Sequence, residues 1–355
     1  MTITSPAPPA APGLVEQHRR LPRFAPTGLF GLGALVGVGL SALTGFSLIL
    51  ALIYAVVLGT VSVYIASRSV EGNRKALDRL VTSMVTTAFA VAMIPLVWLV
   101  WTVLSKGLKR LDAEFFTSSM LGVVGEGGGA YHAILGTLII TGLTAIISVP
   151  IGLLTAIYVV EYGNGRLKRA ITFLVDVMTG IPSIVAGLFA FALFAILFGP
   201  GVRMGIMGAI ALSVLMIPVV VRSSEEVLKL VPNELREAAY ALGVPKWRTI
   251  IKIVIPTAMA GLATGVTLAV ARVIGETAPL LITVGIINGT NVNPFDGRMA
   301  TLPVYAYYQL TQPGFPPEFA IDRAWTAALV LIILVMALNV VARLISRFFA
   351  PKTGR

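Results

Sequence analysis

The chain contains uncharged apolar stretches long enough to cross a lipid bilayer, and this feature constrains its fold more than any other. The first stretch runs from Gly28 to Ala66, and as one helix it would be about 58 Å long, nearly twice the hydrocarbon thickness. We therefore expect two spans with a break near Thr44 and Gly45. Only 12% of the residues are charged, against about 25% in soluble chains, which also indicates a multi-span membrane protein.

Six further stretches of membrane-crossing length follow, so we predict eight spans and an all-α, polytopic transmembrane helical bundle. These stretches are Leu80–Leu104, Ala133–Val160, Ile171–Phe198, Met204–Val221, Ile253–Ile287 and Ala324–Ile345. The stretch that begins at Ile253 is longer than one span needs, and we expect it to break or leave the bilayer near Gly275.

The placement of positive charge supports this arrangement. With both termini in the cytoplasm, most of the 27 lysine and arginine residues fall in the segments on the inner side, as the positive-inside rule requires. A single span over Gly28–Ala66 would instead place Arg19, Arg20 and Arg23 outside. We therefore attribute the net charge of +11 to cytoplasmic loops and expect no nucleic-acid partner.

The predicted spans divide the chain into five parts. They are a disordered cytoplasmic tail over residues 1–27, two extra N-terminal transmembrane helices over 28–66, a cytoplasmic linker over 67–79, a transmembrane domain over 80–347 with a cytoplasmic loop over 222–252, and a short cytoplasmic tail over 348–355. Two long outer segments, Ser105–His132 and about Asn288–Arg323, are either solvated connectors or a docking surface for an extracytoplasmic partner.

The residue types needed for catalysis or metal binding are scarce. The chain has no cysteine, which excludes disulfides, thiolate metal sites and a cysteine nucleophile. Its two histidines, His18 and His132, form no obvious metal site together, and no nucleophile–base pair or pair of catalytic carboxylates is visible. We therefore expect neither an enzyme nor a metalloprotein.

A short charged helix interrupts the apolar chain between Pro232 and Gly243. Proline is tolerated in the first turn of a helix, and Gly243 can end the helix in a left-handed cap, after which Pro245 permits a new helix to start. Its apolar face consists of Leu235, Ala238, Ala239 and Leu242 at helical spacing. The helix either lies on the membrane surface or docks into a groove of another protein. The narrow, alanine-rich face without Trp or Phe favours docking.

This segment resembles the signature of the membrane subunits of ATP-binding-cassette (ABC) importers. Glu237–Ala239 reads EAA, Gly243 follows after three residues, and Ile253–Pro256 follows after nine more. The departure from the signature is Ile255, where the family has leucine. In that family this helix docks into a cleft of the nucleotide-binding subunit. The residues that the resemblance implies in coupling are Glu237, Ala238, Ala239 and Gly243.

ATP is expected to bind elsewhere, because the chain lacks the G-x-x-x-x-G-K-[ST] phosphate loop. We therefore expect no cofactor in this chain, with ATP and Mg²⁺ held by a partner ATPase.

Two ionisable residues inside a predicted span indicate a substrate path. Arg272 and Glu276 lie at i and i+4, hence on one helical face, and ionisable residues in a span are functional candidates by default. Gly261, Gly265 and Ala269 continue this face as a small-residue stripe suited to packing in the bundle interior. Either the pair is a structural link between helices, or Arg272 forms a positive site on an anion path, with Glu276 holding it or competing for it.

Three stretches closely resemble one permease of phosphate-specific ABC importers. They are GETAPLL at Gly275–Leu281, GIPSIVAGLF at Gly180–Phe189 and IPVVVRSSEEVLKLVP at Ile217–Pro232. The resemblance covers about Leu80–Arg347. It implies a type I importer core of six spans, to which this chain adds two N-terminal spans, in a bacterial cytoplasmic (inner) membrane.

The resemblance also implies site residues and partners. Arginines matching Arg222 and Arg272 are implicated in phosphate transport in this family, although Arg222 is equally readable as an ordinary flanking arginine of a loop. The implied partners are a second permease, two copies of an ATP-binding subunit, an extracytoplasmic phosphate-binding protein and membrane lipid. The alternatives are a permease for another oxyanion or an organic solute, and a component that serves phosphate sensing.

Packing contacts are expected at two further places in the chain. Asp176, inside a predicted span, is expected to form a helix-end or inter-helix hydrogen bond. The two extra N-terminal spans carry Gly33 and Gly37 in a small-xxx-small spacing and are expected to pack on the core or on a partner.

Overall fold

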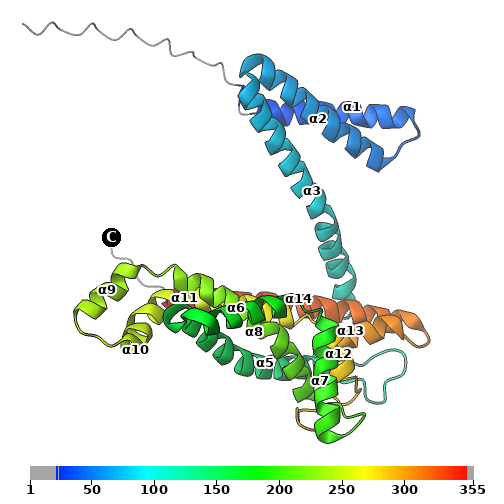
Figure 1. The fold of residues 1–355 in the computed structure, drawn as a ribbon. Coiled ribbons are helices and arrows are strands. Elements are labelled where there is room, and N and C mark those ends of the chain that lie inside the picture. Colours follow the sequence, from blue (N-terminus) through cyan, green and yellow to red (C-terminus); the bar gives the residue numbers. More distant parts are fainter. Residues whose placement is uncertain (1–20, 23, 350–355) are drawn as a thin grey trace, which may run out of the picture. The chain divides into compact units, whose positions relative to one another are not determined.

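The computed structural model describes residues 21, 22 and 24–349, so most of the predicted tails over 1–27 and 348–355 lies outside the described residues. In this described part, all regular secondary structure is helical. The contacts divide the chain into two compact units, Met1–Val100 and Trp101–Arg355. Figure 1 shows the helices of both units.

The first unit contains α1 (Ala25–Leu43), α2 (Leu48–Val70) and α3 (Asn73–Gly107) as far as Val100. The break between α1 and α2 confirms that the first apolar stretch forms two helices. Glycines bring the two helices into close contact, because a Cβ atom at Gly33 would lie 2.7 Å from the backbone nitrogen of Gly59. The small residues of α1 therefore pack on α2. Packing of these two spans on the core or on a partner stays a prediction.

The second unit is a bundle built around α8. Its helices are α4 (Ala113–Thr117), α5 (Tyr131–Ile157), α6 (Gly165–Thr179), α7 (Ser183–Phe198), α8 (Gly205–Lys229), α9 (Asn233–Ala241), α10 (Lys246–Thr249), α11 (Ile255–Val273), α12 (Ala278–Thr283), α13 (Leu302–Thr311) and α14 (Pro317–Phe349), with a 3-10 turn η1 (Leu108–Arg110) and π-helical turns η2 (Tyr158–Tyr162) and η3 (Ile250–Val254). Leu212 and Met216 of α8 are fully buried against Ile140 of α5 and Val273 of α11.

The described chain has seven helices long and apolar enough to cross a membrane, or up to eight if the α6–α7 pair counts as one span. The predicted span over Ile171–Phe198 is sharply bent, because α6 and α7 meet at an angle of 106°. Pro182 at this break lacks an N–H and disfavours the helical conformation at Ile181. The expected break near Gly275 is confirmed, because α11 ends at Val273 and α12 begins only at Ala278.

The glycine-rich segment before α5 is folded against two arginine side chains. Arg323 donates to the carbonyl oxygen of Gly125 over 2.7 Å, and Arg110 donates to that of Gly128 over 2.9 Å. Ser105–His132 is therefore not a merely solvated connector. Its use as a docking surface stays a prediction.

Candidate functional site

The charged helix α9 has the ends that its sequence predicts. Pro232 precedes its first turn, and Gly243 follows its last turn with a left-handed φ of +75°. The N–H of Gly243 donates to the carbonyl oxygen of Tyr240 over 2.9 Å, which closes the helix. Pro245 then caps α10, as expected. A glycine is needed at the left-handed position because other residues are strained there.

The surface of α9 divides the predicted coupling residues into two groups. Glu237 and Ala238 are exposed, and Leu242 is 83% exposed, so a partner could contact all three. Ala239 is only 4% exposed and lies on the side of α9 that packs against its own chain. The predicted apolar face is therefore shared between an internal contact and a free surface.

Sequence reasoning missed the side chain that fixes α9 in place. Arg236 forms an ion pair with Glu161 of η2, and the Nη2 and Nε atoms lie 2.8 and 3.1 Å from Oε1. The two side chains are 12% and 5% exposed. Arg236 also donates to the carbonyl oxygens of Leu228 and Val231, over 3.1 and 2.6 Å, where α8 ends. One arginine thus ties α9 to the ends of both α5 and α8.

Arg222, near the same end of α8, lies in a cluster of matched charges. It is hydrogen-bonded to Asp176 of α6, and its Nη1 atom lies 2.9 Å from Oε2 of Glu225. Glu225 also pairs with Lys229 over 2.7 Å. The expected inter-helix hydrogen bond of Asp176 is confirmed. Two carboxylates contact the guanidinium of Arg222, so an anion would have to compete with them.

Arg272 and Glu276 line a cavity of about 200 Å³. Its other lining residues are Met178, Thr179, Ile181, Ser183, Leu215 and Val219. The cavity therefore lies where the α6–α7 break meets the end of α11 and the middle of α8. Arg222 is not among its lining residues, so the structure does not bring the two predicted arginines into one cavity.

The guanidinium of Arg272 has no charge partner in the described part of the chain. No ion pair joins it to Glu276 there, so the interpretation of the two as a structural link has no support. Ser183 lines the same cavity, and the hydroxyl of Thr179 donates to the carbonyl oxygen of Asp176 over 2.6 Å. A guanidinium with free N–H groups beside a hydroxyl can bind an oxyanion through several hydrogen bonds.

The small-residue stripe of α11 holds Arg272 close to α8. A Cβ atom at Gly261 would lie 2.6 Å from the side chain of Val227, and one at Gly265 would lie 2.8 Å from the hydroxyl of Ser223. Ala269 is fully buried. The expected interior packing of this stripe is confirmed, and it makes α8 and α11 one tightly packed pair beside the cavity.

The second unit is a bundle of membrane-length helices with a polar cavity between them and an exposed helix at its end. Together these features define a membrane permease of a transport system. The chain belongs to the family of binding-protein-dependent transport system inner membrane components, whose model matches residues 148–355.

The names of similar proteins are consistent with membership of this family. The chain is 48% identical over 286 residues to phosphate transport system permease protein PstA 1 of Mycobacterium tuberculosis, which covers 80% of this chain and 91% of the relative. It is 39% identical over 276 residues to phosphate transport system permease protein PstA of Pasteurella multocida, covering 76% and 94%. It is also 34% identical to a probable ABC transporter permease protein, YqgI of Bacillus subtilis, covering 76% and 95%.

Solved structures agree on the fold. One chain of a bacterial alginate ABC transporter, solved in complex with an alginate pentasaccharide-bound periplasmic protein, matches with a TM-score of 0.56 at 14% identity. The match covers 78% of this chain and 97% of the transporter chain. The core of this chain therefore has the fold of an ABC importer permease, which confirms the predicted fold class.

Proposed function

We propose that this chain is the permease subunit of an ATP-driven importer of inorganic phosphate. The observation that carries the proposal is the unmatched guanidinium of Arg272 in a cavity between the helices, in a chain whose relatives are named phosphate transport permeases. A permanent positive charge suits phosphate, because the guanidinium stays protonated at any physiological pH and pairs with two oxygens at once.

Coupling to ATP hydrolysis begins at α9 in this proposal. A partner ATPase, which binds ATP and Mg²⁺, contacts the exposed Glu237 and Ala238, while Gly243 sets where the helix ends. Ala239, on the buried side of α9, packs against this chain and holds the helix in place. Closure of the ATPase moves α9, and Arg236 passes this movement to the ends of α5 and α8 through its hydrogen bonds.

Helix α8 links this movement to the cavity. It carries Leu215 and Val219 on the cavity wall and Arg222 further toward α9. Phosphate held by Arg272 would leave when the wall moves, and Glu276 would compete for the arginine as the phosphate departs. Arg222 is a second phosphate-binding position on the path, where phosphate displaces the carboxylate of Asp176 from the guanidinium.

The proposed assembly contains a second permease, two copies of the ATP-binding subunit and an extracytoplasmic phosphate-binding protein. It lies in the bacterial inner membrane, surrounded by lipid, with both termini in the cytoplasm. The family description supports a binding protein and an inner-membrane location. The positive-inside distribution of lysine and arginine supports the orientation.

The test of the substrate is uptake of radiolabelled phosphate by the reconstituted assembly, with unlabelled oxyanions as competitors. We expect ATP-dependent uptake that excess phosphate suppresses and that sulfate and molybdate leave unchanged. ATP-dependent uptake of sulfate or molybdate in place of phosphate would identify another oxyanion permease. An assembly that transports none of these anions would contradict the proposal.

A further inference from the structure

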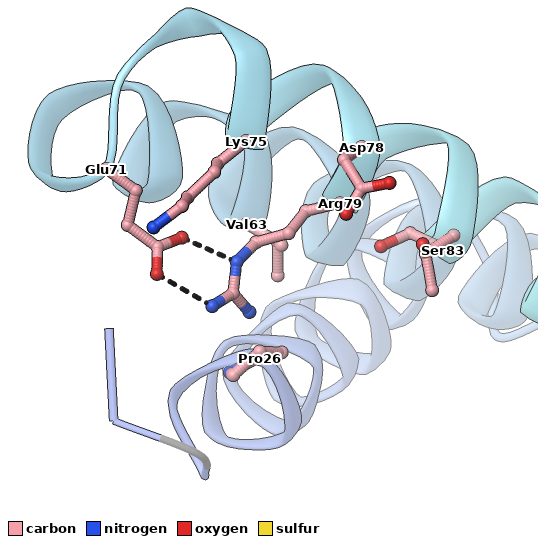
Figure 2. Close-up of a pocket in the computed structure, with 8 residues that line it drawn as sticks. Pro26, Val63, Glu71, Lys75, Asp78, Arg79 and Ser83 are labelled. Carbon is pink, nitrogen blue, oxygen red and sulfur yellow. Dashed lines mark hydrogen bonds and ion pairs between the residues drawn. The ribbon is translucent and has the colours of Figure 1, made fainter. Parts of the chain in front are cut away.

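The first unit contains a polar pocket where three helices meet. The pocket has a volume of about 490 Å³ and lies where α1 begins, α2 ends and α3 begins (Figure 2). Its lining residues are Pro26, Val63, Glu71, Lys75, Asp78, Arg79, Thr82 and Ser83. All of these residues belong to the first unit, whereas Arg272 belongs to the second.

The carboxylate of Glu71 is at the centre of this pocket, and protein donors occupy all of its hydrogen-bonding positions. Glu71 is buried and accepts hydrogen bonds from Nε and Nη2 of Arg79 over 2.6 and 2.9 Å. It also accepts from the hydroxyl of Ser67 over 2.8 Å and from the backbone N–H of Leu21 over 2.9 Å. These four contacts hold the turn between α2 and α3 and leave Nη1 of Arg79 as the remaining nitrogen of that guanidinium.

Two charges of opposite sign remain available in the pocket. Neither Lys75 nor Asp78 has an ion pair in the described part of the chain. Lys75 is partly buried and precedes Arg79 by one helical turn, so both cations lie on the same face of α3. Figure 2 shows the Lys75 side chain extending beside the Glu71–Arg79 pair, with Asp78 on the next turn.

The pocket lies at a boundary between polar and apolar sequence. Helix α3 carries all of its N-terminal charges between Arg74 and Arg79, and its next charged residue is Lys106. Apolar side chains around the unit face outward, among them Leu35 at 71% and Ile49 at 70% exposure, as expected for helices surrounded by acyl chains. Phospholipid headgroups occupy this depth of a membrane.

We propose that this pocket binds the headgroup of an ethanolamine phospholipid, with its phosphate on Lys75 and Nη1 of Arg79 and its ammonium on Asp78. The net charge of the four ionised side chains in the pocket is zero, which matches a zwitterionic headgroup. Pro26 and Val63 provide the apolar wall beside which the glycerol backbone lies. The proposal requires only that the first unit lies in a membrane, so it stands independently of the transported substrate.

The test measures lipid binding to the intact, delipidated assembly by native mass spectrometry. Phosphatidylethanolamine and phosphatidylglycerol with the same acyl chains are titrated into wild type and variants. Lys75→Gln should weaken binding of both lipids at least about tenfold, because a direct hydrogen bond to a charged group contributes about 1.5–3 kcal/mol. Asp78→Asn should remove the preference for phosphatidylethanolamine and leave binding of phosphatidylglycerol intact.

The matched control is Arg74→Gln, which removes the same charge from the exposed neighbouring position outside the pocket and should bind both lipids as wild type does. The proposal is overturned if Lys75→Gln binds both lipids as tightly as Arg74→Gln. It is also overturned if inorganic phosphate binds to the lipid-free assembly in a Lys75-dependent manner and displaces the lipid, since the pocket would then be a site for free phosphate.

Discussion

Arg236 of α9 and Glu161 of η2, the turn that directly follows α5, form an ion pair between residues 75 positions apart, with Nη2 and Oε1 separated by 2.8 Å. Both side chains are almost completely buried, so the pair is a fixed connection rather than a surface contact. It joins the helix expected to contact the ATPase to a helix of the bundle. The π-helical turn η2 that carries Glu161 is a feature often found at functional positions.

Loss of this ion pair should uncouple ATP hydrolysis from transport. Arg236→Gln leaves Glu161 buried without its partner, which costs about 3 kcal/mol, and loosens α9 from α5 and α8. We expect an assembly that still hydrolyses ATP but transports far less phosphate per ATP. Measuring uptake and hydrolysis in the same proteoliposomes gives this ratio.

The exchanged pair Arg236→Glu with Glu161→Arg serves as the control for that experiment. If the ion pair transmits movement, the exchange should restore part of the transport per ATP that either single substitution removes. An unchanged amount of phosphate transported per ATP in Arg236→Gln would show that α9 acts without this ion pair.

The end of α9 should depend on the backbone conformation of Gly243 and not on space around it. A Cβ atom there would meet no atom within 4 Å, yet the φ of +75° costs an L-residue about 1–2 kcal/mol. Gly243→Val should therefore reduce both uptake and co-purification of the ATPase. Gly243→Asn, which tolerates this conformation, should retain most of both. Equal effects of the two substitutions would argue against the role of the left-handed cap.

The turn between α2 and α3 should lose stability in acid. Hydrogen bonds from Arg79 lower the pKa of Glu71 from 4.5 to about 2, with further contributions from Leu21 and Ser67. Because the pKa is lower in the folded state, the stabilisation is complete above about pH 5 and disappears as the pH falls from about 4.5 through 2. Hydrogen exchange of amides in this turn should differ between wild type and Glu71→Gln at neutral pH. The difference should shrink steadily below about pH 4.5, and a constant difference would be inconsistent with this pKa.

Features that depend on local chemistry could be predicted from the sequence. The cap at Gly243, the break near Gly275 and the division of the first apolar stretch follow from glycine, proline and the length of apolar runs. The bend between α6 and α7 was missed because the apolar character continues across Pro182, and hydropathy does not report direction. Gly180 and Pro182 were the local signals for that bend.

Features that depend on distant residues could not be predicted in this way. Glu161 and Arg236 are too far apart in the sequence for any helical spacing to predict their ion pair. The burial of Ala239 depends on how the chain folds back after α9. The i, i+4 spacing correctly placed Arg272 and Glu276 beside one cavity, but helical spacing alone could not show that they form no ion pair. Ser183 lines the same cavity, and it lies at the start of α7 directly after the α6–α7 bend, which hydropathy did not reveal.

The most direct test of the central claim is ATP-dependent phosphate uptake by the assembly that carries Arg272→Gln, compared with Arg166→Gln at an exposed position at the start of α6. Assembly with the ATPase and the second permease is checked for both variants by co-purification. Uptake should fall at least about tenfold in Arg272→Gln, because a hydrogen bond to a charged group contributes about 1.5–3 kcal/mol, and should remain unchanged in Arg166→Gln. Uptake near the wild-type rate in a fully assembled Arg272→Gln complex would contradict the proposed path.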